Sequence, residues 1–160
     1  MEGILTSDDA SELTGDATQV IVGPPNLVTV NQPSPAAGSY DAGYAAFAPQ
    51  PTVSGVSGAI VLVDDGSVNP TLGCLPLVGF PAGAIALISR GICEFDVKAQ
   101  NAQNAGAVAV IIFNNVAGDL PMNLGGDATT ITIPTVSVTS TAGAIIRAGL
   151  PATGTVSRKP

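Results

Sequence analysis

Residues 90–115 read RGICEFDVKAQNAQNAGAVAVIIFNN and contain the clearest junction between a helix and a strand in the chain. Apolar or small side chains recur at Phe95, Ala99 and Ala102, which is the spacing of one helical face. The two acids near the start of this stretch suit the positive end of a helix dipole, and Gly106 is typical of the position just after a helix. We therefore predict a helix that ends before this glycine.

Continuous apolar runs flank the predicted helix on both sides. AIALIS (84–89) precedes it and VAVIIFNN (108–115) follows it, and neither run alternates with polar residues. Such runs are typical of strands covered on both faces, as in parallel sheets. A strand, a helix and a strand within about 30 residues form a βαβ unit, so residues 84–89 and 108–113 are expected to pair in parallel.

The rest of the chain is predicted to consist of short strands, turns and one further helix. In chain order we expect two extended pieces at 18–35, a strand at 59–67, an ordered loop at 68–83, a strand at 131–138, a helix at 140–149 capped by Ser140 or Thr141, and a last strand at 153–159. Pro134 indicates an edge strand or a bulge. Residues 36–58 are expected to be irregular, with Tyr40, Tyr44 and Phe47 anchoring a loop to the core.

Composition sets the size and class of the chain. With 160 residues, of which 46% are hydrophobic, it can build one well-buried core. The polar and acidic residues 1–18 are predicted to form an N-terminal arm, and residues 19–160 a single domain. The arm carries no basic residue and does not resemble a signal peptide, and no apolar run is long enough to insert into a membrane.

Charge and residue usage exclude several classes of function. The formal net charge is −7 and no histidine is present. Nucleic-acid binding needs a basic surface, so we expect no nucleic acid as a partner. Catalysis by Ser-His-Asp or Cys-His groups is impossible without histidine, and two cysteines alone do not hold a zinc ion. We therefore expect no catalytic residue, no metal and no cofactor.

Two groups of charged residues have both a functional and a structural interpretation. Asp64 and Asp65 could form a catalytic carboxylate pair, but acids between a strand and a glycine more often make a turn. Arg90 and Lys98 could hold a peptide carboxylate or carbonyl. Alternatively, Lys98 extends along the helix surface and pairs with Glu94, while Arg90 fixes a loop.

Two further pairs remain open on the residues alone. Asn114 and Asn115 follow the second strand of the βαβ unit, at the sheet edge where open α/β sheets often bind ligands, although turn formation is the simpler interpretation. Cys74 and Cys93 could be joined, closing a loop of about 20 residues, or could be two buried free thiols. Their number does not decide between these states.

Taken in order, these features resemble the protease-associated (PA) domain family. The matching elements are Gly73-Cys74, the strand 84–88, Arg90-Gly91, Cys93, Phe95, Lys98, Asn101-Ala102, the turn 105–107, Asn114-Asn115 and Ile133-Pro134. The resemblance covers residues 55–148. It implies an α/β, mainly β chain with the swivelling β/β/α fold, in which short helices flank a compact sandwich or barrel-like sheet. It also implies a Cys74–Cys93 disulfide and a ligand region near Arg90 and Gly91.

The resemblance implies no catalytic activity. We predict a non-catalytic module of an exported protein, extracellular or at the cell surface, that binds peptide or protein segments or covers a neighbouring peptidase domain. Its peptide-binding candidates are Arg90, Gly91, Asn114 and Asn115. The alternative is a structural spacer without a ligand of its own. An enzyme that uses only carboxylates, such as Asp64, is the third and weakest hypothesis.

Overall fold

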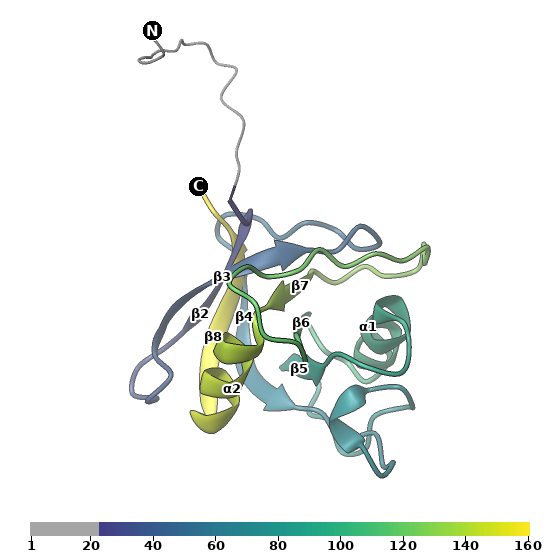
Figure 1. Cartoon of the computed structure of the whole chain (residues 1–160). Helices are drawn as coiled ribbons and strands as arrows, with labels where there is room; N and C mark the ends of the chain where they lie inside the picture. The colour runs from purple at the N-terminus through teal and green to yellow at the C-terminus, as the bar shows by residue number, and fades with distance from the viewer. Residues whose placement is uncertain (1–22) are drawn as a thin grey trace, which may run out of the picture.

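A closed barrel of seven strands forms the centre of the computed structural model, which describes residues 23–160 (Figure 1). The predicted arm at 1–18 lies outside the described residues. The strands are β2 (Asn26–Val30), β3 (Gly38–Tyr44), β4 (Val56–Leu62), β5 (Ile85–Ser89), β6 (Ala109–Phe113), β7 (Thr135–Val138) and β8 (Ala152–Arg158). Around the barrel their order is β2-β3-β7-β6-β5-β4-β8. The mainly β fold class predicted from the sequence is therefore confirmed, with a barrel rather than two packed sheets.

The predicted βαβ unit forms one side of the barrel. β5 and β6 pair in parallel, with Ile85 opposite Ala109, and α1 (Phe95–Asn104) connects them. Gly106 follows the helix with a φ of +94°, as expected for a residue just beyond a helix end. β4 and β7 extend the parallel set on either side, and β2, β3 and β8 close the barrel in antiparallel pairs.

Each central strand contributes to two separate cores. Ile85 and Leu87 of β5 point into the barrel, where they join an inner cluster that also contains Ile146 of α2 (Ser140–Ala148). Ala86 and Ile88 of the same strand belong to an outer cluster under α1. This arrangement explains why the run 84–89 shows no alternation, because both faces of β5 are buried.

Alanines on the inner face of α1 let this helix lie close to the sheet. Ala99 and Ala102 have no exposed surface and pack in the outer cluster with Ala86 and Ile88. Figure 1 places α1 on the same side of the barrel as the loop 68–83, which includes the short 3-10 helix η1 (Pro70–Leu72). Neither helix among residues 23–160 is long or apolar enough to cross a bilayer.

Three sequence predictions are wrong in detail. Residues 36–58 are not wholly irregular, because β3 gains backbone partners in both β2 and β7. The strand predicted at 131–138 starts only at Thr135, after Pro134, and it lies between two strands rather than at an edge. The cap of α2 is Thr139, one residue before the predicted Ser140 or Thr141, and its side chain accepts a hydrogen bond from the N–H of Ala142 at 3.1 Å.

The Thr139 cap gives a first testable prediction. Thr139→Ala removes the acceptor for one free N–H group of α2, and it should lower the free energy of unfolding by about 1 kcal/mol. For a domain of this size the corresponding fall in Tm is about 2–4 °C. Thermal unfolding followed by circular dichroism measures it, with Thr141→Ala, an exposed residue of the same helix, as the control. An equal loss in both variants would contradict the assigned cap.

Candidate functional site

The four peptide-binding candidates lie together where β5 and β6 end. The two strands run in parallel with Ser89 opposite Phe113, so the residues after them meet at one edge of the sheet. Arg90 donates from Nη1 to Oδ1 of Asn114 at 2.9 Å. The side-chain nitrogen of Asn115 lies 3.7 Å from the place that a Cβ on Gly91 would take. Arg90 therefore ties two loops together, as the structural interpretation of this residue predicted.

A disulfide joins the loop before β5 to the start of α1. Cys74 and Cys93 are bonded, with their Cα atoms 5.7 Å apart. The bond fastens the loop 68–83, which lies over the N-terminal end of α1, to the residues that follow β5. The disulfide implied by the family resemblance is therefore confirmed.

Asp64 and Asp65 form a turn, and their side chains bind backbone groups. Asp64 accepts a hydrogen bond from the N–H of Gly66, and Asp65 accepts one from the N–H of Ser67. The second oxygen of Asp65 accepts from the N–H of Cys74 at 3.0 Å. Burial alone would raise the pKa of Asp65, but hydrogen bonds from Ser67 and Cys74 outweigh it and hold the pKa below its usual value. The turn interpretation is confirmed, and Asp65 also connects this turn to the loop 68–83 through Cys74.

The position of Lys98 contradicts both sequence interpretations, the peptide-binding group and the surface ion pair. Its side chain neither follows the helix surface nor pairs with Glu94, because the residue has no exposed surface. Its Nζ donates to the carbonyl oxygens of Leu72 at 2.6 Å and Gly91 at 2.8 Å. Burial lowers the pKa of Lys98 to about 8, although the charge of Asp65 opposes this shift. Lys98 binds carbonyls of its own chain and is not placed to bind a ligand.

The backbone of the loop 90–94 is partly engaged in its own hydrogen bonds. The N–H of Arg90 donates to Phe113, and the N–H of Cys93 donates to the carbonyl of Gly91 at 2.8 Å. These two N–H groups are therefore not free to receive a peptide carbonyl. The N–H groups of Gly91 and Ile92 make no hydrogen bond within residues 23–160, and neither do those of Glu94 and Phe95 at the start of α1. A ligand beside this loop could therefore use these donors.

A groove of about 460 Å³ opens beside this loop. One wall is the segment from Arg90 to Phe95, and the other is Gly125, Gly126 and Asp127. The loop that carries the second wall is tied to α1, because Asp96 accepts hydrogen bonds from two of its N–H groups, both at 3.1 Å. The predicted candidates Asn114 and Asn115 do not line this groove, whose second wall comes from a loop farther along the chain.

Two features of the groove have no counterpart among the sequence predictions. The segment 125–127 is Gly-Gly-Asp, and its two glycines leave Asp127 as the one residue of this wall that has a side chain. At Gly125 an added Cβ would meet nothing within 4 Å, so the space beside it is open. Ile92 also lines the groove, and no pattern in the sequence separates it from an ordinary core residue.

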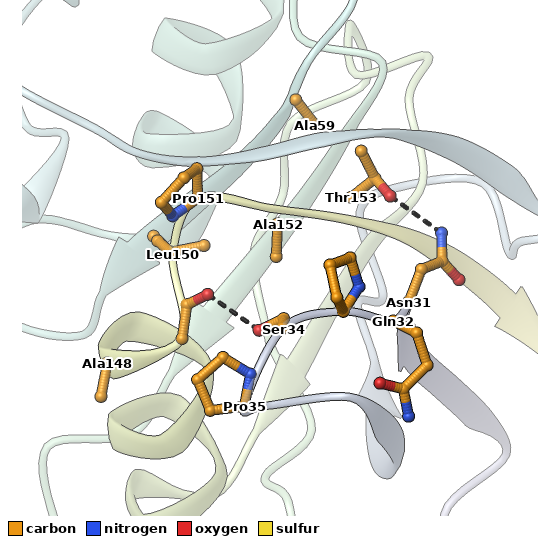
Figure 2. Close-up of a pocket in the computed structure, with 12 residues that line it drawn as sticks. Asn31, Gln32, Ser34, Pro35, Ala59, Ala148, Leu150, Pro151, Ala152 and Thr153 are labelled. Atoms are coloured by element: carbon orange, nitrogen blue, oxygen red, sulfur yellow. Dashed lines mark hydrogen bonds between the residues drawn. The ribbon is translucent and has the colours of Figure 1, made fainter.

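A second groove, of about 490 Å³, lies at a different part of the barrel (Figure 2). It forms between the turn after β2 and the connection from α2 to β8. Ser34 donates to the carbonyl of Gly149 at 2.8 Å, and Asn31 donates to Thr153 at 3.0 Å. None of its lining residues is ionisable. In addition, no group of three or more His, Cys, Asp or Glu residues within 23–160 could share a metal ion.

Comparison with known proteins finds one matching family model and relatives of more than one kind. The family model described as PA domain matches residues 68–146. An aminopeptidase from Pseudomonas aeruginosa is 69% identical over 35 residues, which are 22% of this chain and 6% of that protein. A receptor homology region, transmembrane domain- and RING domain-containing protein from Arabidopsis thaliana is 35% identical over 104 residues, which are 60% of this chain and 32% of that protein.

Solved structures share the fold. A zinc aminopeptidase from Bacillus subtilis superposes with a TM-score of 0.61 and 26% sequence identity, covering 86% of this chain and 31% of that chain. The chain therefore spans about a third or less of the proteins it resembles.

Proposed function

This chain carries a PA domain, and from that premise we propose that it is a non-catalytic module that binds peptide or protein segments beside a peptidase. Its role is that of a substrate-access or lid domain in an exported protein, extracellular or at the cell surface. We further propose that residues 19–160 form the single domain, with the motif core at 55–148.

The groove beside Arg90 is the observation that carries this proposal. Arg90, which carries a guanidinium, lines it together with Gly91 and Ile92, whose N–H groups make no hydrogen bond within residues 23–160. Such groups suit the carbonyls or the terminal carboxylate of an extended peptide. The loop is also held rigidly, since the disulfide and Lys98 both fix it, and a preorganised site loses less entropy on binding.

Two further observations support the attachment to a peptidase and the export. The relatives from Pseudomonas aeruginosa and Bacillus subtilis are named as aminopeptidases, and this chain covers only a part of each. A disulfide persists in oxidising compartments outside the cytosol. A neighbouring peptidase domain is therefore the protein partner that we propose.

A purely structural role is the second candidate, and one observation favours it. Arg90, Lys98 and Asp65 all bind groups of their own chain, so much of the polar chemistry near the groove already stabilises the fold. A spacer domain would need these contacts and no ligand. Binding measurements on variants at Arg90 separate the two roles.

We expect Arg90→Ala to weaken peptide binding by about tenfold to a hundredfold, because a charge-assisted hydrogen bond contributes about 1.5–3 kcal/mol. Peptides are selected from a random pool on the wild-type chain, and their Kd values are then measured by fluorescence anisotropy. Arg147→Ala is the matched control, since it removes the same charge from an exposed position on α2. Failure of the pool to yield any binder would favour the structural role.

A further inference from the structure

Ile92 has a backbone conformation that its side chain disfavours. Its φ is +67°, and it is the one non-glycine residue with a positive φ among residues 23–160. A β-branched side chain is strained in this region, whereas glycine and asparagine tolerate it. Burial does not offset the strain, because 90% of the Ile92 surface is exposed. Neither backbone preference nor core packing therefore accounts for an isoleucine at this position.

Three contacts hold the strained turn. The hydrogen bond from Cys93 to the carbonyl of Gly91 closes a γ-turn with Ile92 at its centre, and this hand of γ-turn is rare and strained. Lys98 donates a second hydrogen bond to the same carbonyl, and Cys93 is covalently bonded to Cys74. Strained residues persist where the surrounding structure fixes them, and they occur preferentially at ligand sites.

The groove around Ile92 offers one apolar wall, one open wall and an acidic edge. Ile92 and Phe95 lie on the first wall, and Gly125 on the facing wall has no side chain. Ile92 and Gly125 line the same groove, so a ligand side chain that occupies it can contact Ile92. Glu94 and Asp127 also line the groove, and together with Arg90 they give its lining a net charge of about −1, which disfavours an acidic side chain.

We propose that Ile92 is the specificity-determining contact of the groove, and that it selects peptide segments with an apolar side chain flanked by neutral or basic residues. This inference rests on the proposed peptide-binding function. In this arrangement the disulfide and Lys98 hold the strained backbone of Ile92, so that its apolar side chain faces the ligand. Exposure of Ile92 in the free chain is the expected state of a residue that is buried only when the ligand binds.

Ile92→Gly separates ligand contact from stability, because the two should change in opposite directions. Glycine removes the strain and loses almost no buried surface, so Tm should stay unchanged or rise by about 1–3 °C. The apolar contact is lost, so the Kd of peptides selected on the wild-type chain should increase by at least about tenfold. Ile92→Asn, which also tolerates the positive φ, should weaken binding to a similar extent.

The selected peptides and the two variants provide the decisive outcomes. Enrichment of an apolar residue next to neutral or basic residues, together with weaker binding by both variants, supports the inference. Peptides that bind the wild type and Ile92→Gly equally would overturn it while leaving the proposed function in place. A pool without any binder to the wild type would overturn the proposed function and this inference together. A marked fall in the Tm of Ile92→Gly would also contradict it, since Ile92 would then be a structural residue.

Discussion

Replacing Cys74 and Cys93 together by alanine is expected to lower the free energy of unfolding by about 3 kcal/mol. The bond closes a loop with a sequence separation of 19, and without it the unfolded chain gains conformational freedom. The loop 68–83 contains several prolines and glycines and lies on the surface, so few local interactions replace the bond. Tm should fall by about 6–12 °C, as measured by thermal unfolding.

The double variant should still fold, because Lys98 still joins the same two segments by donating to both Leu72 and Gly91. The hydrogen bond from the N–H of Cys74 to Asp65 also remains, since none of these contacts needs the sulfur atoms. A reducing agent should therefore lower the Tm of the wild type towards that of the variant and leave the variant unchanged. Hydrogen exchange should accelerate first in residues 90–94. A wild-type Tm that does not respond to the reducing agent would count against this account.

Local patterns were sufficient to predict the βαβ unit. Continuous apolar runs identified β5 and β6, and the alanine face identified α1, because both faces of these strands and one face of the helix are buried. β3 was not predicted, because its sequence has no such apolar pattern. Its sequence GSYDAGY has two glycines and an aspartate, and it is a strand because β2 and β7 supply hydrogen bonds on both sides. Such pairing depends on residues far away in the sequence.

The candidate site was predictable only in part. The position of Arg90, Gly91, Asn114 and Asn115 at one sheet edge follows from the parallel pairing of β5 and β6. The wall at Gly125 comes from a loop that Asp96 fixes over a long sequence separation. The conformation of Ile92 depends on a disulfide and a buried lysine that converge on its neighbours. No periodicity in the sequence encodes contacts of this kind.

Lys98 is the clearest case in which a distant contact overrides a local pattern. A lysine four residues after Glu94 predicts a surface ion pair. The loop that contains Leu72 instead folds over this position, 26 residues away in the sequence, and covers the side chain completely. Burial of a charge is unfavourable unless it is well hydrogen-bonded, and here two carbonyl oxygens supply that stabilisation.

Lys98→Ala is expected to lower the free energy of unfolding by about 3 kcal/mol at pH 7, because it removes a packed side chain and leaves the Leu72 carbonyl without its donor. Lys98→Met is the matched variant, since it keeps most of the volume and removes only the donor. The free energy of unfolding of Lys98→Met should fall by less, about 1–2 kcal/mol. Chemical denaturation measures both values. A methionine variant as stable as the wild type would show that the two hydrogen bonds contribute nothing net.

The pH dependence of stability tests the buried charge itself. Burial lowers the pKa of Lys98 from 10.5 to about 8, so at pH 9 the folded state has lost a proton that the unfolded state still binds. Stability should therefore rise with pH from about 8 towards 10, by at most about 3 kcal/mol. The rise is measured relative to Lys98→Met, which lacks the titrating group. This reference is needed because burial raises the pKa of Tyr40, and Tyr40 therefore lowers the stability of both proteins near pH 10. Parallel curves for the two proteins between pH 7 and 9.5 would mean that burial does not lower the pKa of Lys98.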